Sequence, residues 1–171
     1  IATIIYYTCI SHSPTEVNFY VVDMGAGTLR SFIKYPHVGD VCTIDDGDKI
    51  IDLMAMVERE IGRRKDLTVD FGGTFNTYNE MNPDNKLPLM TIIINNLDVF
   101  EENFPKIADL ITPLYRDGAK YGVTFIITFL GINTLRSKVR EYFANHISLV
   151  AANKDDYFSL FDNYKRNTEP A

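Results

Sequence analysis

The stretch Leu89–Asp98 constrains the fold of this chain more than any other part of the sequence. It opens with six apolar or β-branched residues, Leu89–Ile94. The run then ends at the polar residues Asn95, Asn96 and Asp98. A continuous apolar run of this length is typical of a strand that is buried on both faces of a parallel sheet. We therefore predict an α/β fold, with candidate ligand-binding residues where this strand ends.

The rest of the sequence alternates short β-rich runs with amphipathic helical patterns. Ile50, Leu53 and Val57 lie on one face of the clearest helix, which we predict over residues 47–65. Further strands are predicted at 17–22, near 38–44, at 123–128 and at 147–151, and further helices at 1–10, 102–117, 133–143 and 155–161, with helical turns within 28–35. This alternation predicts a mainly parallel sheet with helices on both faces.

Residues 66–86 are polar and carry Gly72, Gly73 and Pro83, which predicts an irregular surface loop. Gly118 is the expected C′ residue of the helix at 102–117. The length of 171 residues is that of a single domain, so we assign residues 1–171 to one. Ile1–Ile10 lacks an initial Met and has the pattern of a helix tail. We therefore expect a domain that is incomplete at its N-terminus.

Composition limits the classes of partner and site. The net charge of −6 argues against a nucleic-acid surface as the main feature of the domain. Cys9 and Cys42 are too few and too far apart for a disulfide framework or a zinc site, so we predict two structural thiols and no metal centre. No apolar run reaches the roughly 20 residues that span a bilayer.

Several segments, taken in order, match the pattern of one protein family. They are Tyr20–Gly25, Pro36–Val41, Glu58–Lys65, Ile93–Asp98, Tyr115–Val123 and Asp155–Tyr157. With these segments the chain resembles the FtsK/SpoIIIE ATPase family, and it is most similar to the EssC/EccC-type motor subunits of type VII secretion. The resemblance covers nearly the whole chain except residues 66–86.

The resemblance implies a RecA-like P-loop NTPase core whose phosphate-binding loop lies just before the helix at 1–10. It implies that the intact protein uses ATP and Mg²⁺, although this fragment lacks the phosphate-binding loop. The expected partners are neighbouring ATPase domains of the same polypeptide, secreted protein substrates and further copies in a homo-oligomer, whereas DNA is not expected. The expected location is the cytoplasmic side of the membrane, within a larger membrane-anchored protein.

The family positions that hold catalytic acids are occupied by amides here. Asn95 takes the place of the Walker B aspartate, and an amide lacks the charge that a hard cation prefers. Asn96 takes the place of a catalytic glutamate, and an amide does not accept a proton from attacking water. Thr128 matches the polar residue that contacts the γ-phosphate region. We therefore assign no catalytic residue and predict a nucleotide site that is weak or inactive in hydrolysis.

Three other residues leave alternatives open. Asp98 follows the strand and is a possible replacement for the missing carboxylate. Asp23, which precedes a glycine-rich segment, either faces a ligand or forms a turn. Arg116 is either an arginine finger for a neighbouring subunit or a solvated charge at a helix end. The leading hypothesis is a pseudo-ATPase that acts in assembly, regulation or substrate binding. The alternative is an active ATP-hydrolysing motor, for secretion or for DNA translocation.

Overall fold

The computed structural model describes residues 1–131, 135–149 and 161. The chain divides into two compact units, Ile1–Thr128 and Phe129–Ala171. The first unit contains the whole sheet and the candidate site. The assignment of both units to a single domain stays a prediction.

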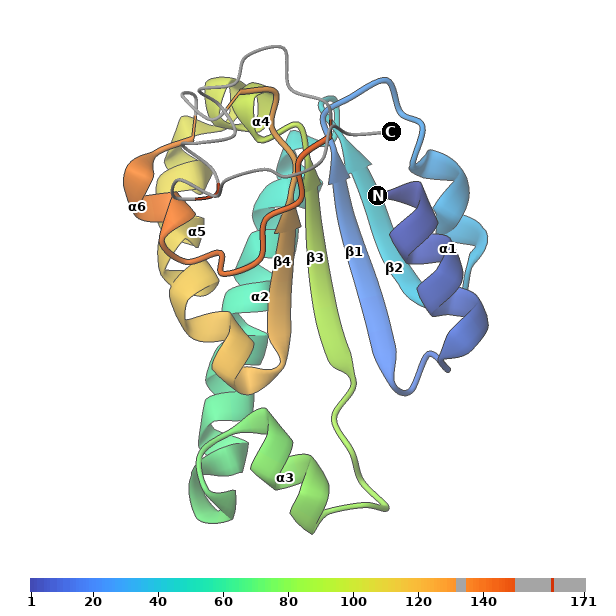
Figure 1. Ribbon diagram of the computed structural model, residues 1–171, viewed down its shortest axis with the longest axis vertical. Helices are drawn as coiled ribbons and strands as arrows, with labels where there is room; N and C mark the ends of the chain where they lie inside the picture. The colour runs from blue at the N-terminus through green and yellow to red at the C-terminus, as the bar shows by residue number, and fades with distance from the viewer. Residues whose placement is uncertain (132–134, 150–160, 162–171) are drawn as a thin grey trace. The chain divides into compact units, whose positions relative to one another are not determined.

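The first unit is built on a four-stranded sheet whose strands are all parallel, in the order β2-β1-β3-β4 (Figure 1). The strands are β1 (Val17–Asp23), β2 (Val38–Thr43), β3 (Leu89–Asn95) and β4 (Val123–Ile127). The register pairs Asp23 of β1 with Asn95 of β3, and Ile94 of β3 with Ile127 of β4. Three neighbouring strands therefore end level with one another.

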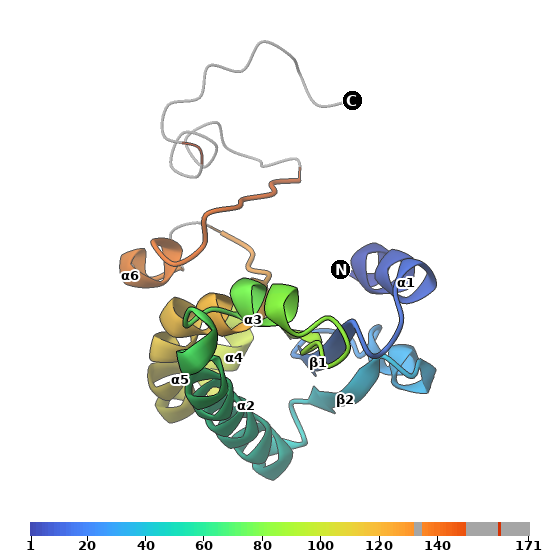
Figure 2. The same ribbon diagram turned by 90° about the horizontal axis from the view of Figure 1, so that it is seen from below.

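Helices cover both faces of this sheet, as the sequence predicted (Figures 1 and 2). One face carries α1 (Ala2–Ser11) and the short 3₁₀ helix η1 (Arg30–Lys34). Ile5 of α1 packs there in an apolar cluster with Phe19, Val21 and Ile93. The opposite face carries α2 (Gly47–Thr68), α4 (Leu97–Asn103) and α5 (Pro105–Gly118). The parallel sheet between two helical layers confirms the predicted fold class.

The central strand β3 is buried on both faces, which confirms the interpretation of its apolar run. Ile92, Ile93 and Ile94 are fully buried, and Thr91 is nearly so. Burying each isoleucine stabilises the fold by about 1.5–3 kcal/mol before entropic costs. Because these side chains fill both faces, β3 fixes the position of the polar residues that follow it.

The prediction of an irregular loop at residues 66–86 is wrong. Helix α2 continues to Thr68 and is followed by the 3₁₀ turn η2 (Val69–Phe71) and by α3 (Phe75–Met81). Thr74 caps α3, because its hydroxyl accepts a hydrogen bond from the backbone N–H of Thr77. A cap of this kind starts a helix even where the sequence has no apolar periodicity.

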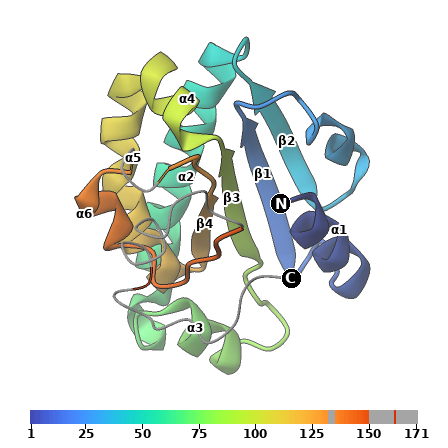
Figure 3. The ribbon, with the colours of Figure 1, turned by 45° about the horizontal axis from the view of Figure 1, so that its top comes forward.

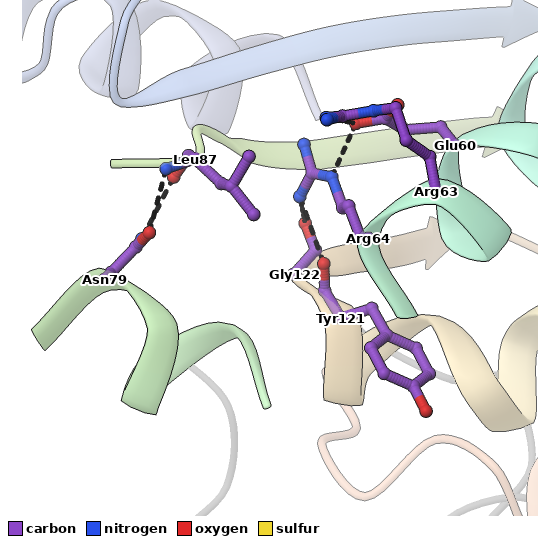
Figure 4. A network of polar contacts seen from close by, with 7 residues as sticks. All are labelled: Glu60, Arg63, Arg64, Asn79, Leu87, Tyr121 and Gly122. Carbon is purple, nitrogen blue, oxygen red and sulfur yellow. Dashed lines mark hydrogen bonds and ion pairs between the residues drawn. The ribbon is translucent and has the colours of Figure 1, made fainter. Parts of the chain in front are cut away.

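Two further contacts explain why this polar segment is ordered. The ring of Tyr78 is buried against the ring of Phe71, with centroids 5.1 Å apart. The side-chain amide of Asn79 makes a paired contact with the backbone of Leu87, donating to its carbonyl at 3.0 Å and accepting from its N–H at 2.8 Å (Figure 4). The ring contact of Tyr78 and the hydrogen bonds of Asn79 therefore order this segment without an apolar helix face.

The buried Arg64 ties the end of α2 to the start of β4 (Figure 4). Its side chain is 1% exposed. Nε donates to Glu60 Oε1 at 2.7 Å, and Nη1 donates to the carbonyls of Tyr121 and Gly122 at 3.1 and 2.9 Å. These bonds compensate for burying the guanidinium, so Arg64 has a structural role here.

The helix predicted at 102–117 is two helices. Pro105 has no N–H to donate and stands at the first position of α5, so Phe104 separates α4 from α5. Gly118 is also not the C′ residue: it keeps helical geometry and the 3₁₀ turn η3 (Ala119–Tyr121) follows. The left-handed residue is Gly122, with φ of 72°.

In the second unit, α6 (Ser137–Arg140) is shorter than the helix predicted at 133–143. Residues 147–149 do not form the predicted strand, and the rest of that strand lies outside the described residues. The helix predicted at 155–161 also lies outside them, apart from residue 161. No helix in the described ranges has the length and apolar character that crossing a membrane requires.

Candidate functional site

The candidate site lies where β1, β3 and β4 end, at the carboxyl edge of the sheet (Figure 3). Asp23 and Asn95 are the last residues of β1 and β3, Asn96 follows β3, and Thr128 follows β4. In open parallel sheets this edge is where ligands bind. The structure therefore brings together three of the predicted site positions and the weaker candidate Asp23.

A continuous chain of hydrogen bonds runs across the three strand ends. The side-chain amide of Asn95 donates to Asp23 Oδ1 at 2.8 Å. The hydroxyl of Thr128 donates to Asn95 Oδ1 at 2.8 Å and accepts from the backbone N–H of Asn96, also at 2.8 Å. Asn95 therefore links a carboxylate on one neighbouring strand to a hydroxyl on the other. The contact between Asp23 and Asn95 joins residues that are 72 positions apart.

Asp23 is 1% exposed, and both of its carboxylate oxygens accept backbone hydrogen bonds. Oδ1 accepts from the N–H of Gly25 and Oδ2 from the N–H of Leu29, each at 3.1 Å. With Asn95, three N–H donors replace the water that a buried carboxylate loses. This geometry supports the turn interpretation, because Asp23 holds the loop between β1 and η1 to the end of β3.

Thr128 is held by its backbone as well as by its hydroxyl. Its N–H donates to the carbonyl of Ile94 at 3.0 Å, and its carbonyl accepts from the N–H of Leu97 at 2.7 Å. The hydroxyl has one proton, and that proton already goes to Asn95. In this conformation Thr128 cannot donate a hydrogen bond to a phosphate.

Asn96 has two unusual features that the sequence did not reveal. Its backbone is left-handed, with φ of 69°, and it is the only non-glycine residue with positive φ in the described part of the chain. Its Oδ1 is buried without a hydrogen-bond partner among the described residues. An orphaned buried acceptor costs about 1–3 kcal/mol, and strain of this kind is found at functional sites. The preference of Asn for left-handed turns was the available signal.

The structure does not bring Arg116 to this site. Helix α5 runs back from the carboxyl edge to the start of β4, so its last turn, with Arg116, lies at the opposite edge of the sheet (Figure 1). The guanidinium of Arg116 donates to both carboxylate oxygens of Asp117 at 2.7 and 2.8 Å. This contact lowers the pKa of Asp117. Both side chains are exposed, as expected for a helix-end charge pair, and the arginine-finger role toward a neighbouring subunit stays a hypothesis.

Asp98 lies in the first turn of α4, after the strand end. A carboxylate there is favoured by the positive end of the helix dipole. The hydrogen bonds described above join Asp23, Asn95, Asn96 and Thr128, and they do not test a role for Asp98. The replacement of the missing acid by Asp98 therefore stays a hypothesis.

Asp23, Asn95, Asn96 and Thr128 together offer no carboxylate that is free of N–H hydrogen bonds to hold magnesium. By the family resemblance, two positions that would face the metal hold amides, and both oxygens of the buried carboxylate Asp23 already accept N–H hydrogen bonds. Across the described ranges, no cluster of three or more His, Cys, Asp or Glu residues is placed to hold a metal ion. The arrangement is a closed hydrogen-bond network in which one acceptor, on Asn96, is left over.

The sequence is similar to those of curated ESX secretion proteins. The chain is 28% identical over 160 residues to the ESX secretion system protein YukB of Bacillus subtilis, covering 93% of this chain and 11% of that protein. It is 29% identical to the ESX-1 secretion system protein EccCb1 of Mycolicibacterium smegmatis, covering 85% of this chain and 26% of that protein. The chain thus spans between about a tenth and a quarter of the length of these relatives.

Solved structures show the same architecture. The cytoplasmic domain of EssC superposes with a TM-score of 0.84 at 23% identity, over 92% of this chain and 31% of that chain. ATPases 2 and 3 of Thermomonospora curvata EccC, solved in complex with a signal sequence peptide, superpose with a TM-score of 0.77 at 26% identity, over 82% of this chain and 26% of that chain. The FtsK/SpoIIIE family model matches residues 1–166. The chain therefore belongs to the FtsK/SpoIIIE family.

Proposed function

We propose that this chain is a degenerate ATPase module of a type VII secretion motor, weak or inactive in hydrolysis. The secretion role is supported by the names of its relatives, which are ESX and type VII secretion proteins. The degenerate state is supported by one observation above all, the hydrogen-bond chain from Asp23 through Asn95 to Thr128. These hydrogen bonds occupy the polar side-chain groups that an active site would direct at magnesium and phosphate.

The same comparisons support two of the partners in this proposal, neighbouring ATPase domains and secreted proteins. A module of this kind lies beside further ATPase domains in one polypeptide, as in the two-ATPase structure of Thermomonospora curvata EccC. Because that protein was solved with a signal sequence peptide, we infer that this module also takes part in recognising secreted proteins. Attachment to the cytoplasmic side of a membrane and assembly into a homo-oligomer complete the proposal.

Turnover of ATP tests the proposed function. The domain, joined to whatever phosphate-binding loop its natural polypeptide supplies, should hydrolyse Mg²⁺–ATP no faster than a variant in which that loop is deleted. Substituting Asn95 by Ala should leave this background rate unchanged, with thermal melting as the check on folding.

The alternative function is an active ATPase that takes its carboxylate from Asp98. The observation in its favour is the position of Asp98 in the first turn of α4, directly after the strand end. Rapid Mg²⁺-dependent hydrolysis that is lost in Asp98→Ala would replace the degenerate-site proposal by this one.

A further inference from the structure

The hydrogen bonds that join Asp23, Asn95, Thr128 and Asn96 form a strand-end network, which connects elements on both faces of the sheet. At one end, Asp23 accepts from two backbone N–H groups in loop 24–29, which leads to η1. At the other end, Thr128 accepts from the N–H groups of Asn96 and Leu97, at the start of α4. Because η1 and α4 lie on opposite faces of the sheet (Figures 1 and 2), the network runs from one helical layer to the other.

Both ends of this connection are anchored in the apolar core. Leu29, at the end of the loop, is buried and packs in the cluster that includes Ile5 of α1. Leu97 and Phe100 are the buried residues of α4. Close-packed interiors transmit strain instead of absorbing it. A shift of either helical layer therefore reaches the backbone groups that the network holds.

Asn96 gives this connection a second possible arrangement. Its left-handed backbone, with φ of 69°, and its buried Oδ1, which has no partner among the described residues, both cost free energy. The side chain of Asn96 makes no capping hydrogen bond to α4 that would repay this cost. The turn is held to β4 by the two backbone hydrogen bonds that Thr128 accepts. Breaking them lets Asn96 leave the strained conformation and lets water reach its Oδ1.

We propose that the strand-end network is a conformational relay, which orders or releases loop 24–29 and the start of α4 together. A partner that contacts one helical layer then changes the order of the other layer, with no nucleotide at the strand ends. This inference rests on the proposed function, in which the network occupies the groups of a nucleotide site, and it adds how the module is regulated. The relay requires coupling across the sheet, whereas a purely structural network requires local hydrogen bonds alone.

Hydrogen exchange of single amides, followed by NMR on the whole chain, measures this coupling. Thr128→Val removes the hydroxyl and keeps the size of the side chain. The amide of Asn96 then loses its acceptor, so faster exchange there is a local effect. The remote effect is the test. The amides of Gly25 and Leu29, which donate to Asp23, should exchange at least about threefold faster than in the unmodified chain.

Thr43→Val is the matched control. Thr43 is the last residue of β2, at the same edge of the sheet, and its hydroxyl donates to Asp46 Oδ2 at 2.8 Å, outside the network. This variant should speed exchange near Asp46 and change the exchange of the Gly25 and Leu29 amides by less than about 1.5-fold. Equal acceleration of those two amides in both threonine variants would overturn the relay, because it would report a general loss of stability.

Asn96→Gly tests the strain in the opposite direction, and it decides the case even if Thr128→Val does not fold. Glycine adopts a positive φ without steric cost and has no side-chain acceptor to bury. The amides of Leu97 and Leu29 should therefore exchange about threefold more slowly than in the unmodified chain. Equal or faster exchange at Leu29 in this variant would overturn the relay. A Thr128→Val effect confined to residues 95–100 would also overturn it.

ATP turnover separates this inference from the function on which it rests. Rapid turnover together with slower Leu29 exchange in Asn96→Gly would overturn the degenerate-site proposal and keep the relay. Absence of turnover together with unchanged Leu29 exchange would do the reverse.

Discussion

Substituting Asn95 by Asp tests the strand-end network in a single atom exchange. The change replaces the Asn95 NH₂ group, which donates to Asp23 Oδ1 at 2.8 Å, by an oxygen. Asp23 is 1% exposed and keeps its two backbone donors, so it has little room to turn away. Restoring the acid that an active ATPase carries at this position should therefore place two carboxylates in contact.

The cost can be bounded in two ways. At an effective dielectric of 20, two unit charges about 2.8 Å apart repel by about 6 kcal/mol. Holding one carboxyl protonated at pH 7 instead costs about 4 kcal/mol, at 1.36 kcal/mol for each pH unit above its ordinary value near 4. The variant adopts the state with the smaller cost, in which one carboxyl is protonated. That carboxyl then donates a hydrogen bond to the other. Asn95→Asp should therefore lower the free energy of unfolding by about 3–4 kcal/mol at pH 7 and by less than about 1 kcal/mol at pH 4.

Urea unfolding at both pH values measures this difference. Asn85→Asp is the matched control, because Asn85 is exposed outside the helices and the same exchange there should cost less than about 0.5 kcal/mol. Adding Asp23→Asn to Asn95→Asp should recover about half of the lost stability, since it restores one amide–carboxylate pair. A loss that is small and independent of pH would refute the buried contact on which the site description depends.

Three further predictions concern other parts of the structure. Gly122→Ala should destabilise the chain by about 2–4 kcal/mol, because a Cβ there would lie 2.2 Å from the ring of Phe75. Gly73 has a similar φ but open space around it, so Gly73→Ala should cost about 1 kcal/mol. Thermal melting compares the two variants. Hydrogen bonds from the last residue of β2 lower the pKa of Asp46 from 3.8 to about 2. Its contribution is therefore present above pH 4 and is lost as the pH falls from 4 to 2, and Asp46→Asn should flatten urea midpoints in that window. Burial raises the pKa of Cys42 to about 11, so at pH 8 a thiol reagent should modify the less buried Cys9 first, as peptide mapping would show.

The sequence predicted the parts of the fold that repeat along the chain. The run at Leu89–Ile94 identified the buried strand because a parallel sheet buries both faces of its central strands. Apolar spacing located α2 because one helical face must pack on the sheet. The family resemblance singled out Asn95 and Thr128, and they lie at one edge because parallel strands end together.

Other features depend on contacts that no local pattern records. Helix α3 is ordered by the hydrogen bonds between Asn79 and Leu87, and no apolar periodicity in this polar segment predicts them. The role of Asp23 was left open between ligand and turn because its decisive partner, Asn95, is 72 residues away. The break before α5 did have a signal in Pro105, but the apolar periodicity on both sides outweighed it.

The central proposal is that the strand-end site is degenerate, and it predicts that the site does not hold a metal-bound nucleotide. Titrating the ¹⁵N-labelled domain with Mn²⁺–ATP, with the phosphate-binding loop joined to it as in the turnover assay, tests it directly, because a bound paramagnetic ion broadens the amide signals near it. The network described here predicts that the signals of Asn96, Leu97 and Thr128 broaden no more than those of the exposed α5 residue Leu110. Selective loss of the Asn96 and Thr128 signals at substoichiometric Mn²⁺–ATP would contradict the proposal.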